Sequence, residues 1–173
     1  MQVRPATLDD AETVRSIYNY EVLHTTATFD LVPRSLEDQQ EWLAARSGAF
    51  SALVAQDDDG TVLGFASLSP YKDRAGYRTS VEDSVYVSRP AHGRGIGRLL
   101  LTNMLQVAES HGFHSVLARI EASGIASRGL HAACGFELVG IEREVGRKFG
   151  RWRDVAVMQC LLHEWARSTR PTL

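Results

Sequence analysis

Apolar side chains recur three or four positions apart in two segments of the chain, one beginning near Ala11 and one at Gly95, and this is the spacing of one helix face. Two further helices are predicted by their ends: Ser35 with an acidic first turn opens LEDQQEWLAARS, and Gly135 stops a short helix from Ala126 to Cys134. The segment from Gly95 to His111 is the most amphipathic of the four and predicts the longest helix. Its apolar side consists of Ile96, Leu99, Leu100, Met104, Val107 and Ala108.

Shorter runs of apolar and β-branched residues lie around these helices and predict strands. The clearest pair is FSALVAQ and VLGFASLS, which flank DDDGT and therefore predict a hairpin with an Asp-Gly turn. The other five runs are MQVRPA, TSVEDSVYV, SVLARIE, FELVGIERE and WRDVAVMQCLL. Strands and helices mixed in this order predict one α+β domain, residues 1–165, followed by a polar C-terminal tail, residues 166–173.

The composition excludes several classes of function. The chain has 173 residues and a net charge of −2, so neither nucleic acid nor a membrane surface is an expected partner. The sequence shows no signal-peptide core and no apolar run that could cross a membrane, so we expect a cytoplasmic location. Cys134, Cys160 and six scattered histidines lack the spacing of metal ligands, and no metal site is expected.

The stretch HGRGIG, residues 92–97, joins the TSVEDSVYV strand to the following helix. Its glycines allow a tight turn, and the first helical turn offers unpaired N–H groups at the positive end of the helix dipole. A plain strand-to-helix turn would explain the glycines equally well. Arg89, Arg94 and Arg98 add positive charge and favour a phosphate or pyrophosphate site.

Two well-known phosphate loops fit this stretch poorly. A P-loop requires Gly-Lys-Ser/Thr, whereas this loop ends with Gly97-Arg98. A dinucleotide loop requires a third glycine where Arg98 stands, although Glu121 lies at the distance of the acid that binds ribose. Too few residues follow the loop for a full doubly wound sheet, so the dinucleotide fold is the weaker alternative.

The stretch SVYVSRPAHGRGIGRLLL resembles the acetyl-CoA motif of the GNAT superfamily of N-acetyltransferases, Q/R-x-x-G-x-G/A. The chain is also similar, from Val3 to Leu162, to the branch that contains phosphinothricin and methionine sulfoximine acetyltransferases. The stretches that carry this likeness are RPATLDDAETVRSIYN, TTATFD, YKDRAGYRTSVEDSVYV, LHAACGFELVG and VGRKFGRWRDVAVMQ. The resemblance implies the GNAT fold, a twisted, mostly antiparallel seven-stranded sheet with helices on both faces.

The resemblance implies acetyl-CoA as cosubstrate, with pantetheine bound to main-chain groups like an added strand and pyrophosphate bound to the glycine loop. Two positions depart from the family. His92 replaces a usual Gln or Arg, and Gly124 replaces an Asn that commonly contacts coenzyme A, so we expect a weakened affinity. The implied coenzyme-binding residues are Val85, Tyr86, Val87, His92, Gly93, Arg94, Gly95, Ile96, Gly97, Arg98, Gly124 and Ser127.

A carboxylate, Glu82, stands inside the strand before the loop. Alternation places Glu82 with Ser84 and Tyr86 on one face, and these residues alone fit a solvated glutamate and a general base equally well. The resemblance favours Glu82 as the base that deprotonates the amine. It also implies that the Val87 N–H stabilises the oxyanion, and that His131 either protonates the leaving thiolate or only packs beside coenzyme A.

The implied reaction acetylates the α-amino group of a small amino-acid-like acceptor by direct attack in a ternary complex. The acceptor would be of the phosphinothricin, methionine sulfoximine or methionine sulfone type, and cations of the SPYKDRAGYR loop would pair with its anionic group. A homodimer is also implied, with KFGRWRDV near the partner. The implied substrate-binding residues are Phe29, Lys72, Asp73, Arg74, Tyr77, Arg78, Glu82, Asp83 and Ser84.

Two other functions remain open at this point. One is acetylation of a protein N-terminus or a polyamine, although a polyamine pocket should be acidic and the SPYKDRAGYR loop is basic. The other is a non-catalytic sensor that binds an acyl-CoA or a nucleotide. An enzyme and a sensor would share the same glycine loop, so turnover distinguishes them.

Overall fold

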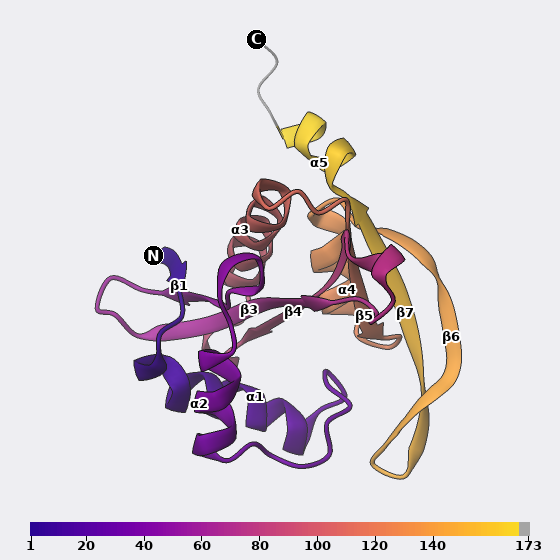
Figure 1. The fold of residues 1–173 in the computed structure, drawn as a ribbon. Helices are drawn as coiled ribbons and strands as arrows, with labels where there is room; N and C mark the ends of the chain where they lie inside the picture. Colours follow the sequence, from indigo (N-terminus) through magenta and orange to yellow (C-terminus); the bar gives the residue numbers. More distant parts are fainter. Residues whose placement is uncertain (170–173) are drawn as a thin grey trace.

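A computed structural model describes residues 1–169 of the chain (Figure 1). Its strands form one sheet in the order β1-β2-β3-β4-β5-β7-β6. Neighbouring strands are antiparallel except for β4 and β5, which are parallel. The strands are β1 (Gln2–Pro5), β2 (Leu53–Gln56), β3 (Val62–Pro70), β4 (Ser80–Val87), β5 (Ser115–Glu121), β6 (Glu137–Lys148) and β7 (Arg151–Leu161).

Helices cover both faces of this sheet, with α1 and α2 on one face and α3 and α4 on the other (Figure 1). The sequence prediction of a mostly antiparallel seven-stranded sheet between two helical layers is confirmed. The helices are α1 (Ala11–His24), α2 (Leu36–Ala44), α3 (Ile96–Ser110), α4 (Ile125–Ala133) and α5 (Leu162–Thr169).

A separate apolar core lies on each face of the sheet. On one face, α3 buries Leu100, Leu101 and Met104 completely against the strands. On the other face, α1 buries Val14 and Tyr18 against β2 and β3. Full burial of one large apolar side chain contributes roughly 1.5–3 kcal/mol, so the sheet is held firmly from both sides.

The parallel strands β4 and β5 separate part-way along their length. β5 pairs only with Ser80–Glu82, whereas β3 pairs with β4 as far as Val87. The Ser88 N–H donates to the Leu63 carbonyl at 2.8 Å. This hydrogen bond shows which alternate residues of β4 direct their main-chain groups toward β3. Even-numbered residues of β4 therefore hydrogen-bond with β3, and odd-numbered residues direct their main-chain groups toward β5.

This alternation leaves a row of main-chain groups facing the gap between β4 and β5. Beyond the last pair, Glu82 with Leu117, the N–H and C=O groups of Val85 and Val87 point toward β5 but have no strand partner there. Unpaired main-chain groups of this kind form a template for an extended ligand.

The C-terminal residues differ from the sequence prediction. The polar pattern predicts a tail from residue 166, but α5 continues through Thr169. Leu162, Trp165 and Ala166 follow a helical i, i+3, i+4 spacing, and all three are buried in the core beside α3. Burial of this apolar face explains the helix, and residues 170–173 of the predicted tail lie outside the described residues.

Candidate active site

A cleft of about 830 Å³ opens where β4 and β5 separate. The loop after α1 forms one wall, and the loop before α3 together with α4 forms the other. The cleft falls within the usual size range of small-molecule sites. Fifteen predicted site residues line it, namely Phe29, Glu82, Asp83, Ser84, Val85, Tyr86, Val87, His92, Gly93, Gly95, Ile96, Gly97, Gly124, Ser127 and His131.

The loop before α3 has the geometry of an anion site. Gly93 and Gly95 adopt φ angles of 76° and 78°, in the left-handed region where residues other than glycine are strained. Gly95 is the N-cap of α3, and no side chain caps the first helical turn. The first N–H groups of α3 have no carbonyl partner within the helix, so they are available to a phosphate.

The three arginines near this loop are placed differently. Arg89 lines the cleft and forms an ion pair of 2.6 Å with the buried carboxylate of Glu21. Arg94 and Arg98 do not line the cleft. Their positive charges contribute to the field around the helix terminus, an effect that salt screens over about 10 Å.

His92 links the glycine loop to the end of β4. Its Nε2 lies 2.9 Å from the carbonyl oxygen of Val87. Because a carbonyl can only accept a hydrogen bond, Nε2 must carry the hydrogen in this contact. The Val87 carbonyl is thereby engaged, while the Val87 N–H still points into the gap beside β5.

Glu82 lies partly buried in the cleft wall, at the point where β4 and β5 separate. Burial raises the pKa of its carboxyl group above the ordinary value, and the positive charge of Arg119 opposes this rise. An ordinary glutamate, with a pKa of about 4.3, is a weak base toward an ammonium group. The local environment therefore makes Glu82 a stronger base than a solvated glutamate.

His131 and Asp83 form a buried pair in the wall of the cleft. The His131 Nε2 lies 3.0 Å from Asp83 Oδ2, and Nδ1 lies 2.7 Å from the carbonyl of Ser127. Burial alone would lower the pKa of His131, but the two partners together outweigh it and the pKa is raised. Both ring nitrogens are thus engaged, and protonation of a thiolate by His131 would require one of these contacts to open.

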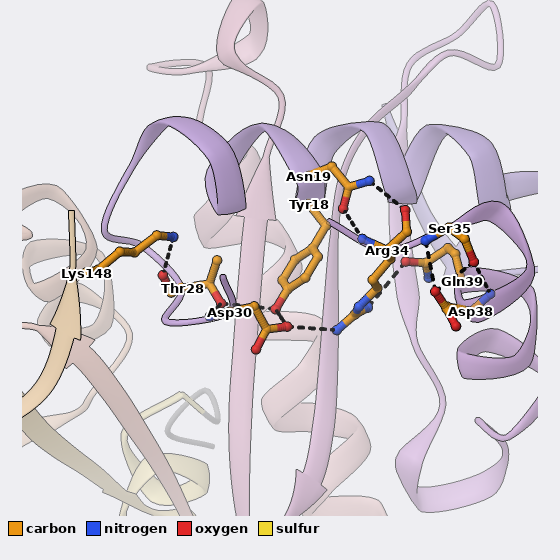
Figure 2. Close-up of polar contacts among 9 residues, drawn as sticks. All are labelled: Tyr18, Asn19, Thr28, Asp30, Arg34, Ser35, Asp38, Gln39 and Lys148. Carbon is orange, nitrogen blue, oxygen red and sulfur yellow. Dashed lines mark hydrogen bonds and ion pairs between the residues drawn. The ribbon is translucent and has the colours of Figure 1, made fainter. Parts of the chain in front are cut away.

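The loop between α1 and α2, residues 25–35, is held in place by polar contacts from three elements (Figure 2). The Tyr18 hydroxyl donates to Asp30 at 2.6 Å and lies 3.0 Å from the Thr28 hydroxyl. Lys148, buried at the end of β6, donates to the Thr28 carbonyl at 2.7 Å. The half of the loop that lines the cleft is therefore tied to both α1 and β6.

The other half of this loop is held against α1 and the start of α2 (Figure 2). The Asn19 side chain accepts from the main-chain N–H of Arg34 at 2.9 Å and donates to its carbonyl at 2.8 Å. Ser35 and Asp38 form a reciprocal capping box at the start of α2. With both halves held, the loop forms a fixed wall of the cleft.

Phe29, at the cleft end of the same loop, packs directly on the main chain of β6. A Cβ atom at Gly146 would lie 2.2 Å from the Phe29 ring. Such an approach is far inside van der Waals contact. Gly146 is therefore what allows the Phe29 ring to lie where it lines the cleft.

The cationic loop between β3 and β4 does not line the cleft. It borders a separate depression, in which the Lys72 ammonium lies 4.7 Å and 5.3 Å from the ring centroids of Tyr71 and Tyr77. Since the cationic residues of this loop do not line the cleft, its predicted role in acceptor binding stays a prediction. Together with Arg94 and Arg98, five residues of this loop are the predicted site residues that do not line the cleft, namely Lys72, Asp73, Arg74, Tyr77 and Arg78.

Two charged residues of β5, Arg119 and Glu121, also line the cleft. Neither is among the acetyltransferase site residues predicted from the sequence. Arg119 forms an ion pair with Glu142 of β6, and Glu121 accepts hydrogen bonds from Ser123 and Thr26. The signal in the sequence was the alternation within SVLARIE, which puts both charges on one face of an otherwise apolar strand.

Among residues 1–169, no cluster of His, Cys, Asp or Glu side chains has the arrangement of a metal site. No helix in this part of the chain is long and apolar enough to cross a membrane. Cys134 and Cys160 are free and buried. Burial raises the pKa of the Cys160 thiol to about 12, so this sulfur is not a thiolate near neutral pH.

Comparisons with known proteins agree with this geometry. A model of the acetyltransferase (GNAT) domain matches residues 3–157. A phosphinothricin N-acetyltransferase of Streptomyces coelicolor is 42% identical over 90% of this chain and 93% of its own. An L-methionine sulfoximine/L-methionine sulfone acetyltransferase of Pseudomonas paraeruginosa is 40% identical over 91% of this chain and 92% of its own.

A solved structure shows the same fold with acetyl-CoA bound. It is a GNAT superfamily phosphinothricin acetyltransferase from Sinorhizobium meliloti, 37% identical, with a TM-score of 0.90 over 99% of this chain and 92% of that one. The glycine loop, the gap between β4 and β5 and the carboxylate of Glu82 thus occur in a chain whose whole length matches acetyltransferases. The chain belongs to the GNAT family of acetyltransferases.

Proposed function

We propose that this enzyme transfers an acetyl group from acetyl-CoA to the α-amino group of a small amino acid of the phosphinothricin, methionine sulfoximine or methionine sulfone type. Relatives that bear these activities in their names are 40–42% identical to the chain over about nine tenths of its length. The structural observation that carries the proposal is the gap between β4 and β5, which places unpaired main-chain groups beside Glu82.

The residues that would hold acetyl-CoA form a continuous path along the cleft. The uncapped N-terminus of α3 would bind the pyrophosphate, as the left-handed Gly93 and Gly95 allow a close approach. The free main-chain groups of Val85 and the free N–H of Val87 would bind pantetheine as a strand partner. Gly124 and Ser127 at the start of α4 would border the same path.

In the proposed reaction, acetyl-CoA supplies an activated acyl group, and a C–N bond to the amine replaces its C–S bond. Glu82 accepts the proton of the acceptor ammonium, directly or through one water molecule, so that the nitrogen lone pair becomes available. The N–H of Val87 donates to the developing negative charge on the carbonyl oxygen; loss of one such donor typically costs about 2.7–4 kcal/mol. After the attack, the nitrogen loses a second proton and the released thiolate takes up one, so that an amide and a free thiol are formed.

We also propose that the enzyme is a homodimer in the cytoplasm. Large apolar side chains of β6, of the β6–β7 turn and of the start of β7 are exposed, which is unusual for a monomer. Free cysteines fit a reducing compartment. The exposed side chains are Leu138, Val139, Ile141, Val145, Phe149 and Trp152.

Free-thiol release from acetyl-CoA tests the proposal. The panel consists of phosphinothricin, methionine sulfoximine, methionine sulfone, ordinary amino acids, a polyamine and a short peptide. We expect release with the first three compounds, and we expect Glu82→Gln to lose turnover while it keeps its affinity for acetyl-CoA. Release only with the polyamine or the peptide would overturn the proposed acceptor, and no release with any amine would overturn the reaction.

A further inference from the structure

The face of the sheet toward α1 carries a pair of opposite charges on the two strands that separate. Glu82 of β4 pairs with Leu117 of β5, so Leu117 and Arg119, two residues further on, share the face of Glu82. Both charged residues line the cleft. The two groups are close enough for the positive charge of Arg119 to act on the carboxyl group of Glu82.

Arg119 is held in position from the neighbouring part of the sheet. Its Nη1 and Nη2 both donate to the carboxylate of Glu142 on β6. A guanidinium has five N–H donors, and this contact uses two of them. Arg119 remains one third exposed, so its other donors are accessible from solvent and from the cleft that it lines.

The chemistry of an amino-acid acceptor requires a cation beside the base. The acceptor's carboxylate is attached to the same carbon as its reacting nitrogen. When this nitrogen lies next to Glu82, the acceptor's negative charge is therefore close to that of the Glu82 carboxylate. Two arginines line the cleft among the described residues. Arg89 is paired with the buried Glu21 next to the glycine loop, whereas Arg119 lies on the face of Glu82.

We propose that Arg119 binds the α-carboxylate of the amino-acid acceptor and thereby selects amino acids over amines that lack this group. The planar guanidinium suits two-point contact with a carboxylate. Glu142 acts as a positioning residue that holds Arg119 toward the cleft. This inference rests on the proposed function and adds the residue that would recognise the acceptor as an amino acid.

Two acceptors that differ in one charge test the inference. L-Methionine sulfone carries the carboxylate, and its carboxamide keeps the amine and the size but not the negative charge. We expect Arg119→Gln to raise the KM for methionine sulfone roughly 10–100-fold, the range for losing a hydrogen bond to a charged group. The KM for acetyl-CoA should stay the same. The change with the carboxamide should be much smaller than that with methionine sulfone, because only the effect of Arg119 on the Glu82 carboxyl group is lost there. Arg119→Lys should recover part of the affinity for methionine sulfone.

Arg143→Gln is the matched control, because Arg143 is an exposed residue of β6 that does not line the cleft.

An equal loss of kcat/KM with both acceptors in Arg119→Gln would overturn the proposal, since the effect would then come from Glu82 or from the fold. No loss with either acceptor would overturn it as well. Equal kcat/KM for both acceptors in the unmutated enzyme would overturn the carboxylate role and leave the acetyltransferase standing. No thiol release with either would overturn both.

Discussion

Glu82 lies where burial and a nearby arginine act on its pKa in opposite directions, with a net rise. A general base must be ionised to accept a proton, so kcat/KM for the acceptor should fall as the pH drops through this raised pKa. The pH–rate profile should therefore show an acidic limb above the ordinary glutamate pKa of about 4.3. Residual activity of Glu82→Gln should lack this limb. A limb at or below the ordinary pKa would contradict the assignment.

The same burial should lower the stability of the enzyme near neutral pH. The pKa of Glu82 is higher in the folded than in the unfolded enzyme. The contribution of its protonated form to the free energy of unfolding is therefore fully present below the unfolded-state pKa and is lost as the pH rises through the folded-state pKa. Glu82→Gln removes the buried charge, so we expect its urea midpoint at pH 7 to exceed that of the unmutated enzyme. The difference should shrink toward pH 4. An unchanged or lower midpoint at pH 7 would show that the site does not disfavour the charge.

At the scale of elements, the contact between β6 and the loop after α1 shapes the acceptor side of the cleft. Gly146→Ala places a Cβ atom 2.2 Å from the Phe29 ring, so the ring must move. We expect a higher KM for the acceptor, an unchanged KM for acetyl-CoA, and a loss of stability of about 1–3 kcal/mol. Steady-state kinetics and denaturant unfolding measure these effects.

Gly140 on the same strand provides the control for this variant. A Cβ atom at Gly140 would meet no atom within 4 Å, so Gly140→Ala should leave both KM values unchanged. If Gly146→Ala behaved like Gly140→Ala, the Phe29 ring would have no part in the acceptor pocket.

The order of the elements was predictable because their apolar periodicity is local. The Asp-Gly hairpin and the α3 pattern are read within a few residues, and both occur in the structure. Helix α5 was missed because Leu162, Trp165 and Ala166 are only three apolar positions in a polar segment. Their burial beside α3 depends on packing between distant segments, which no local pattern contains.

The part of the candidate site that lies within one short stretch of sequence was predictable as well. The glycine loop and Glu82 stand out within one short stretch, and they line one cleft. The ion pair of Arg119 with Glu142 and its position beside Glu82 follow from the parallel pairing of β4 with β5 and from the strand order, which are non-local. That the residues of the Lys72 loop border a depression of their own and do not line the cleft likewise depends on tertiary geometry.

At the scale of the whole molecule, the long β6–β7 hairpin lies at one edge of the sheet (Figure 1). Several of its large apolar side chains are exposed. Trp152 is 61% exposed there. If this surface is the dimer interface, Trp152→Glu should convert a dimer to a monomer in sedimentation velocity, because the charge would be buried without a partner. Leu8→Glu, at an exposed apolar position outside this hairpin, should leave the dimer intact. A monomeric unmutated enzyme at all concentrations would contradict the proposal.

The central claim is that the gap between β4 and β5 brings an acyl thioester to an amino-acid nitrogen beside Glu82. The most direct test follows acetyl-CoA labelled with carbon-13 in its acetyl group by NMR, with methionine sulfone as acceptor. We predict that the label moves from the thioester to an amide at the α-nitrogen with the unmutated enzyme and that, over the same time, nearly all of it stays on the thioester with Glu82→Gln. Label that appears only in free acetate, or that reaches the amide equally fast with Glu82→Gln, would contradict the account.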